Sequence, residues 1–133
     1  MKYNCHGDIE LNWLGNILIC KPSGSINFEG AQRFHQLIND SIATHNYSRW
    51  ARIEYFTDMQ TLATLDAYEL LTLHLEDIVN KGCIFIGLVS GNALEIELFK
   101  KACCSIGLPC KEFNHLSEAI EYITNSFNTI FRI

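Results

Sequence analysis

The chain has only two prolines among its 133 residues, and it has no long run of apolar residues. Its longest apolar stretch, Cys83–Val89, is far shorter than the roughly 20 residues that a membrane-spanning helix needs. Residues 1–8 also lack the apolar centre of a signal peptide. These absences predict a cytoplasmic protein without a membrane span. The content of 48% hydrophobic and 19% charged residues is typical of one globular domain, expected over residues 1–133.

Basic residues are few and scattered along the chain. Ten Lys and Arg stand against 15 Asp and Glu, which gives a formal net charge of −5. A groove that follows the phosphates of a nucleic acid needs its Lys and Arg side chains clustered. We therefore expect no nucleic-acid partner.

The six cysteines contain no Cys-x-x-Cys pair, the spacing that is typical of structural zinc sites. In a reducing cytoplasm such cysteines are expected to be buried free thiols. We predict no metal and no other cofactor. No catalytic motif is present, so we also predict that the protein is not an enzyme, with a cysteine-based hydrolase or redox enzyme kept as a third alternative because a Cys–His pair would form through space.

The first part of the chain predicts an antiparallel hairpin. Residues 9–13 alternate between apolar and polar, Gly15 and Asn16 can form a tight turn, and residues 17–20 resume an extended pattern. The segment Pro22-Ser23-Gly24-Ser25 is expected to end the second strand.

Apolar residues at three-four spacing then predict four helices, each preceded by a strand. The strands are expected at 50–56, 83–89 and 110–113. The helices are expected from about residue 29 to 45, from 64 to 80, from 93 to 106 and from about 116 to 127. Their expected N-caps are Asn27, Thr64, Asn92 and either Asn114 or Ser117. The buried face of the second helix is expected to hold Leu71, Leu75, Ile78 and Val79.

Residues 83–89 are apolar at both parities, which indicates a strand that is covered on both faces at the centre of a parallel sheet. The predicted element order is ββαβαβαβα. Short connections and right-handed crossovers would wind these elements into an α/β fold with a mixed sheet.

That order resembles the STAS or SpoIIAA-like superfamily, which includes the bacterial anti-sigma factor antagonists. The resemblance covers nearly the whole chain and is carried by Asn27-Phe28-Glu29-Gly30-Ala31, by Lys81-Gly82-Cys83-Ile84 and by Leu116-Ser117-Glu118-Ala119-Ile120. The match is nearer to the uncharacterised bacterial SpoIIAA-like proteins than to the antagonists. It implies a right-handed βα superhelix that opens with the antiparallel hairpin.

In the antagonists, the loop after the third strand carries an Asp-Ser-Ser-Gly motif whose serine is phosphorylated. Here residues 58–64 hold that place without the motif. A hydroxyl at a helix N-terminus is well placed to carry phosphate, so Thr61 and Thr64 are phosphoacceptor candidates. The alternative for Thr64 is an ordinary N-cap and for Thr61 a plain loop residue. The candidate interaction or phosphoacceptor loop comprises Thr57, Asp58, Met59, Thr61 and Thr64.

The resemblance implies a non-enzymatic regulatory or protein-interaction domain with an unidentified protein partner. Its working surface would lie between Phe56 and Tyr68, where Met59 and Leu62 are expected to be exposed. The sequence leaves open whether the chain forms a homodimer.

The alternative function is a carrier for a small apolar or lipid-like ligand, because some relatives in the wider SpoIIAA-like group are likened to Sec14-type domains. Phe28, Tyr55, Phe56 and Tyr68 are the candidate pocket residues. The same aromatic side chains would also fill an ordinary core.

Overall fold

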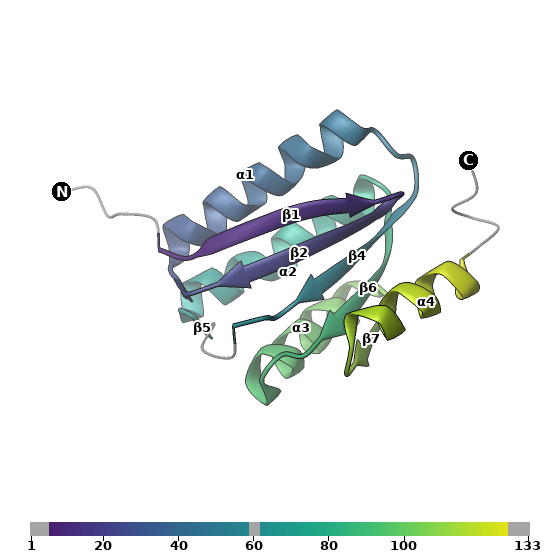
Figure 1. Ribbon diagram of the computed structural model, residues 1–133. Helices are drawn as coiled ribbons and strands as arrows, with labels where there is room; N and C mark the ends of the chain where they lie inside the picture. The colour runs from purple at the N-terminus through teal and green to yellow at the C-terminus, as the bar shows by residue number, and fades with distance from the viewer. Residues whose placement is uncertain (1–5, 59–61, 128–133) are drawn as a thin grey trace.

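The computed structural model describes residues 6–58 and 62–127, which form a mixed sheet packed against helices (Figure 1). The strands are β1 (Asp8–Leu14), β2 (Ile17–Ser23), β3 (Ser25–Ile26), β4 (Trp50–Tyr55), β5 (Leu62–Ala63), β6 (Cys83–Val89) and β7 (Cys110–Phe113). The helices are α1 (Phe28–His45), α2 (Leu65–Asn80), α3 (Ala93–Ile106) and α4 (Leu116–Ser126). No described helix has both the length and the apolar character to cross a membrane.

The main sheet has the strand order β1-β2-β4-β6-β7. β1 and β2 form the expected antiparallel hairpin, and every later neighbour is parallel. Because β6 lies between β4 and β7 and is buried along nearly all its length, the prediction of a doubly covered strand at 83–89 is confirmed. The α/β class and the mixed sheet are likewise confirmed.

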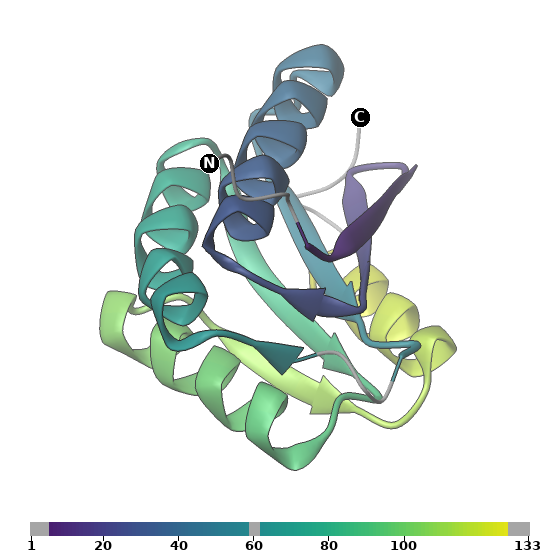
Figure 2. The same ribbon diagram turned by 90° about the vertical axis from the view of Figure 1, so that its left-hand side faces the viewer.

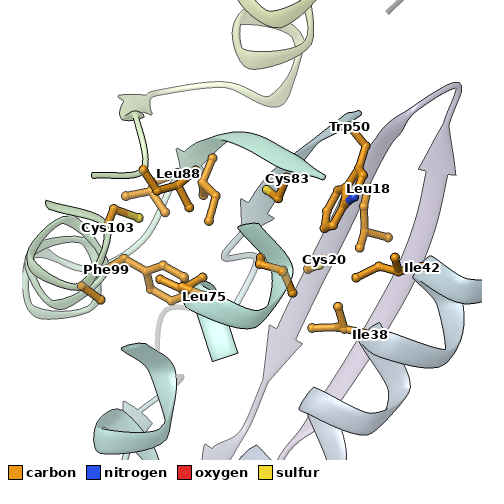
Figure 3. Packing of buried hydrophobic residues seen from close by; sticks show 14 of the residues in the cluster. Leu18, Cys20, Ile38, Ile42, Trp50, Leu75, Cys83, Leu88, Phe99 and Cys103 are labelled. Atoms are coloured by element: carbon orange, nitrogen blue, oxygen red, sulfur yellow. The ribbon is translucent and has the colours of Figure 1, made fainter. Parts of the chain in front are cut away.

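Helices α1, α2 and α3 cover one face of the sheet and α4 covers the other, as the two views together show (Figures 1 and 2). The core is split accordingly. The larger cluster lies under α1–α3 and includes Leu18, Ile38, Trp50 and Leu75, whose side chains meet between sheet and helices (Figure 3). The smaller cluster packs under α4.

Strand β2 ends at Ser23, within the predicted stop at residues 22–25, but it includes Pro22 and runs past the extended segment expected at residues 17–20. Pro22 pairs with Ile9 of β1, whereas the pairing of β2 with β4 stops at Cys20. Beyond Cys20, β2 is therefore an edge on the β4 side, where a proline without an N–H group removes no ladder hydrogen bond. The two-residue strands β3 and β5, which pair in parallel, were not predicted because they are too short to carry a period.

Three of the four predicted helix caps are confirmed. Asn27, Thr64 and Asn92 each accept a hydrogen bond from a backbone N–H in the first turn. The prediction for α4 was wrong, because its N-cap is His115 and that side chain makes no capping bond. The turn before α4 is instead held by the Ser90 hydroxyl, which donates to the Asn114 carbonyl at 3.1 Å.

The buried face of α2 differs from the prediction at two positions. Val79 is 37% exposed, whereas His74 is only 9% exposed and lies in the stripe with Leu75 and Ile78. The stripe is therefore rotated toward His74, whose ring bonds a charged side chain beneath the helix. Of the five described cysteines, all are free thiols, and Cys20, Cys83 and Cys103 are buried.

Candidate functional site

A cavity of about 500 Å³ lies between α1, α2 and the face of the sheet that these helices cover. Its walls are largely apolar, and α1 and α2 contribute most of them. The exposed side chains Gln32, Gln36 and Leu73 also line it, which places its mouth between the two helices. A volume of this size is within the range of about 300–1,000 Å³ that is usual for small-molecule sites.

Charged side chains line the deep end of the cavity. Arg52 and Glu54 stand two residues apart on β4, so both point from the same face of the sheet. Both are almost completely buried, at 3% and 2% exposure. One Arg52 amino group bonds the Glu54 carboxylate, and the other lies 2.7 Å from Nε2 of His74. The cavity therefore holds a buried ion pair that is tied to α2.

Burial and the mutual attraction of the two groups act in opposite directions on the charges of this ion pair. Burial opposes the charge on the Arg52 guanidinium, but the adjacent Glu54 carboxylate keeps its pKa above the usual range. Burial raises the pKa of Glu54, and the guanidinium opposes that rise. The close contact between the two groups favours the ionised form of both.

The protonation of His74 follows from its neighbours. Arginine only donates hydrogen bonds, so Nε2 of His74 must accept and its proton resides on Nδ1. That proton is directed at Nδ1 of His35, 2.7 Å away on α1. Burial, with Arg52 nearby, lowers the pKa of His74 well below the usual histidine value. His74 is therefore a neutral link between the ion pair and α1.

The chain of contacts reaches the surface at His35. Its Nε2 lies 3.7 Å from the Asp77 carboxylate. Asp77 also accepts a hydrogen bond from Lys81 at 2.9 Å, and this bond lowers the pKa of Asp77. A continuous polar path thus runs from the deep end of the cavity to its rim between α1 and α2.

Three polar atoms at the cavity have no hydrogen-bond partner among the described residues. They are Nε of Arg52, the hydroxyl of Tyr68 and Oε1 of Glu95. Glu95 is only 3% exposed, and burial raises the pKa of its carboxyl. Burial raises the pKa of the Tyr68 hydroxyl, which is therefore neutral, and interaction with the nearby Glu95 carboxyl raises it further, although no hydrogen bond of standard geometry joins the two groups. A buried polar atom without a hydrogen-bond partner lowers the stability of the fold, so these atoms indicate a ligand that hydrogen-bonds them.

The cavity has the composition of a binding site. It combines apolar walls with a few convergent polar groups whose pKa values are shifted, and such groups cluster at functional sites. It offers a donor at Arg52, an acceptor at Glu95 and a hydroxyl at Tyr68 that can act as either. Among the described residues there is no group of three His, Cys, Asp or Glu side chains arranged to hold a metal ion.

The four candidate pocket residues lie in different places. Phe56 and Tyr68 line the cavity. Phe28 begins α1 and does not line it, and Tyr55 points to the opposite face of the sheet, where it packs against the cluster under α4.

The candidate loop of residues 57–64 is described only in part. Thr57 is exposed, and the Asp58 carboxylate accepts a hydrogen bond of 2.9 Å from the Gly24 N–H. Thr64 is the N-cap of α2. Met59 and Thr61 lie outside the described residues, as does the side chain of Leu62.

Sequence reasoning missed most of the site. Arg52 and Glu54 carried a usable signal, because two opposite charges at alternate positions of an otherwise apolar strand indicate a pair on one buried face. Glu95 lies in the first turn of α3, where a carboxylate is common in any helix, so its position gave no signal of a site. His74 was placed on a helix, with no signal that it would be buried.

Two solved structures have the same architecture. One is the Bacillus cell fate determinant SpoIIAA in its phosphorylated form, which is 13% identical, with a TM-score of 0.58 over 87% of this chain and 99% of the other. The second is an uncharacterised DUF3478-family protein with a SpoIIAA-like fold from Shewanella loihica. It is 18% identical, with a TM-score of 0.63 over 92% of this chain and 98% of the other.

This chain has the SpoIIAA-like fold. The resemblance seen in the sequence is confirmed at the level of fold. No family model and no curated protein sequence matches the chain.

Proposed function

We propose that this SpoIIAA-like domain is a non-enzymatic binding domain that encloses a small apolar molecule between α1, α2 and the sheet. The observation that supports the proposal is the cavity of about 500 Å³ whose deep end carries three unpartnered buried polar atoms. An ordinary core would fill this space with side chains, because protein interiors are close-packed. A ligand would fill it instead and would hydrogen-bond the buried polar atoms.

The proposal is tested by blocking the cavity. Ala31 lines it from α1, so Ala31→Phe places a ring in the space that the ligand needs. The control is Ala43→Phe, an exposed position on the same helix. Binding of the neutral apolar dye Nile red is followed by fluorescence, and circular dichroism confirms that both variants fold.

We expect wild type and Ala43→Phe to bind the dye and Ala31→Phe to lose most of the binding. Native mass spectrometry of protein purified without delipidation should show a co-purifying small molecule in the same two proteins. Equal dye binding by all three proteins, or no dye binding by wild type, would contradict the proposal.

A second candidate function is protein interaction at the carboxyl edge of the sheet. α2 and α3 both begin there, and Leu65 and Leu94 at their first turns are 77% and 56% exposed. Large exposed apolar side chains are typical of contact surfaces. Leu65 directly follows Thr64 of the candidate loop.

This candidate is tested with Leu65→Asp and Leu94→Asp, using Val79→Asp at the opposite end of α2 as the control. Cross-linking in cell extract should recover one protein with wild type and with the control but not with the two leucine variants. Recovery of that protein by all four chains would argue against this surface.

A further inference from the structure

We propose that the cavity takes an uncharged molecule with one small hydrogen-bonding group, a hydroxyl or a primary amide, which enters first and bonds Arg52, Tyr68 and Glu95. The apolar body of the ligand would follow and fill the space toward the mouth. This inference rests on the proposed function and specifies its ligand.

The three unpartnered atoms come from three elements and face one cavity. Arg52 projects from β4, Tyr68 from α2 and Glu95 from α3. Arg52 and Glu95 are each 3% exposed, so their polar atoms lie at the deep end, away from Gln36 and Leu73 at the mouth. A ligand therefore has to bring its polar group inward to meet them.

The atoms offer both kinds of hydrogen bond. Nε of Arg52 can only donate, whereas Oε1 of Glu95 accepts when the carboxyl is ionised. The Tyr68 hydroxyl can do either. A hydroxyl or an amide on the ligand both donates and accepts, so a single small group can form hydrogen bonds with more than one of these atoms.

The charges at the deep end oppose an ionic ligand. The charge of Arg52 is already matched by Glu54, with which it is in direct contact. A carboxylate would add a negative charge beside Glu54 and Glu95. An ammonium group would lie near the Arg52 guanidinium, and pairing it with Glu95 would require that buried carboxyl to be ionised, which burial opposes. Burying an ion without a matching partner is far more costly than burying a neutral polar group that is hydrogen-bonded.

The rest of the lining requires an apolar body. Ile26, Phe34, Ile38, Leu71 and Phe99 form walls between the deep end and the mouth. Each methylene group that moves from water into such an environment contributes about 0.8 kcal/mol, close to a fourfold gain in affinity. Affinity should therefore rise with chain length until the volume is filled.

The experiment compares four probes with the same carbon chain: octanol, octanamide, octanoate and octylammonium. Each competes with Nile red for wild-type protein at neutral pH. We expect octanol and octanamide to displace the dye at concentrations at least tenfold lower than octanoate and octylammonium. If either ionic probe competes equally well or better, the inference is wrong although the cavity binds small molecules.

A failure of the proposed function gives a different result. In that case Nile red itself does not bind, and the inference falls with it. The two failures are thus distinguishable from one titration series.

A variant pair tests the polar contact itself. Glu95→Leu removes the acceptor at the deep end, and Glu97→Leu makes the same change at an exposed position of α3. We expect Glu95→Leu to reduce the preference for octanol over octanoate at least fivefold while Glu97→Leu leaves it unchanged. An unchanged preference in both variants would overturn the assignment of Glu95.

Discussion

The Tyr68 hydroxyl is the atom at which binding and stability should respond in opposite directions. In the ligand-free protein this hydroxyl is buried and has no hydrogen-bond partner among the described residues. Tyr68→Phe removes only that oxygen and keeps the ring against the cavity. The substitution therefore separates the hydrogen bond from the packing of the ring.

The expected gain in stability comes from the unsatisfied group. A buried polar group left without a partner costs about 1–3 kcal/mol, and Tyr68→Phe recovers that amount. For a domain of this length the change corresponds to an increase of roughly 4–11 °C in the unfolding temperature. Ligand binding should weaken at the same time, by about two- to tenfold, because a net hydrogen bond of about 0.5–1.5 kcal/mol is lost.

The assay combines urea unfolding of the ligand-free protein with displacement of Nile red by octanol. Tyr122→Phe is the control, because Tyr122 lies on α4 at the opposite face of the sheet, and its unfolding free energy should change by less than about 0.5 kcal/mol. A Tyr68→Phe variant that is less stable than wild type, or that binds octanol equally well, would refute the reasoning.

Three further predictions concern the glycine at position 82, the buried Arg52–Glu54 ion pair and His74. Gly82→Ala should lower the free energy of unfolding by about 3 kcal/mol or more, because Gly82 has a φ of +104° and a Cβ there would lie 2.3 Å from the Ser48 carbonyl oxygen. The control is Gly107→Ala, where φ is also positive but the space around a Cβ is open, and it should lower that free energy by only about 1–2 kcal/mol in the same urea titration. Arg52→Met should destabilise the fold by about 3–5 kcal/mol because it leaves Glu54 buried and unpaired, and adding Glu54→Leu should restore most of the loss; a double variant no more stable than the single one would contradict this. Burial lowers the pKa of His74, so its contribution to stability is present above the usual histidine pKa of about 6.5 and is lost as the pH falls below it. The unfolding free energy of wild type, measured with urea, should therefore decrease below that pH, and that of His74→Gln should decrease less. The same pH dependence in both proteins would contradict the role assigned to His74.

Local sequence patterns were sufficient for most of the fold. The hairpin, the doubly apolar strand β6 and the caps at Asn27 and Asn92 each depend on residues within one element, where period and capping chemistry act directly. The errors arose where a neighbour in space decides the outcome. Pro22 is tolerated in β2 only because β4 ends its pairing earlier, and no local pattern reports that.

The site could be predicted only in part, for the same reason. Of the four aromatic residues predicted to line a pocket, Phe56 and Tyr68 line the cavity and Phe28 and Tyr55 do not. The polar contacts were missed because His74, Arg52 and Glu95 come from three separate elements. A sequence period shows that a face is buried, but it does not show which charged group of another element meets it.

The arrangement of the deep end argues for a ligand on energetic grounds. Three unsatisfied buried atoms at about 1–3 kcal/mol each are a large fraction of the roughly 5–15 kcal/mol that a domain of this kind has in total. Apolar side chains at Tyr68 and Glu95 would remove most of that cost, and neither side chain serves as a helix cap. Water that enters from the mouth can bond these atoms, and a ligand that bonds them while its apolar body displaces the remaining water adds the free energy of binding to the stability of the fold. The ligand-bound domain should therefore be the more stable form, and its unfolding midpoint should rise with octanol concentration.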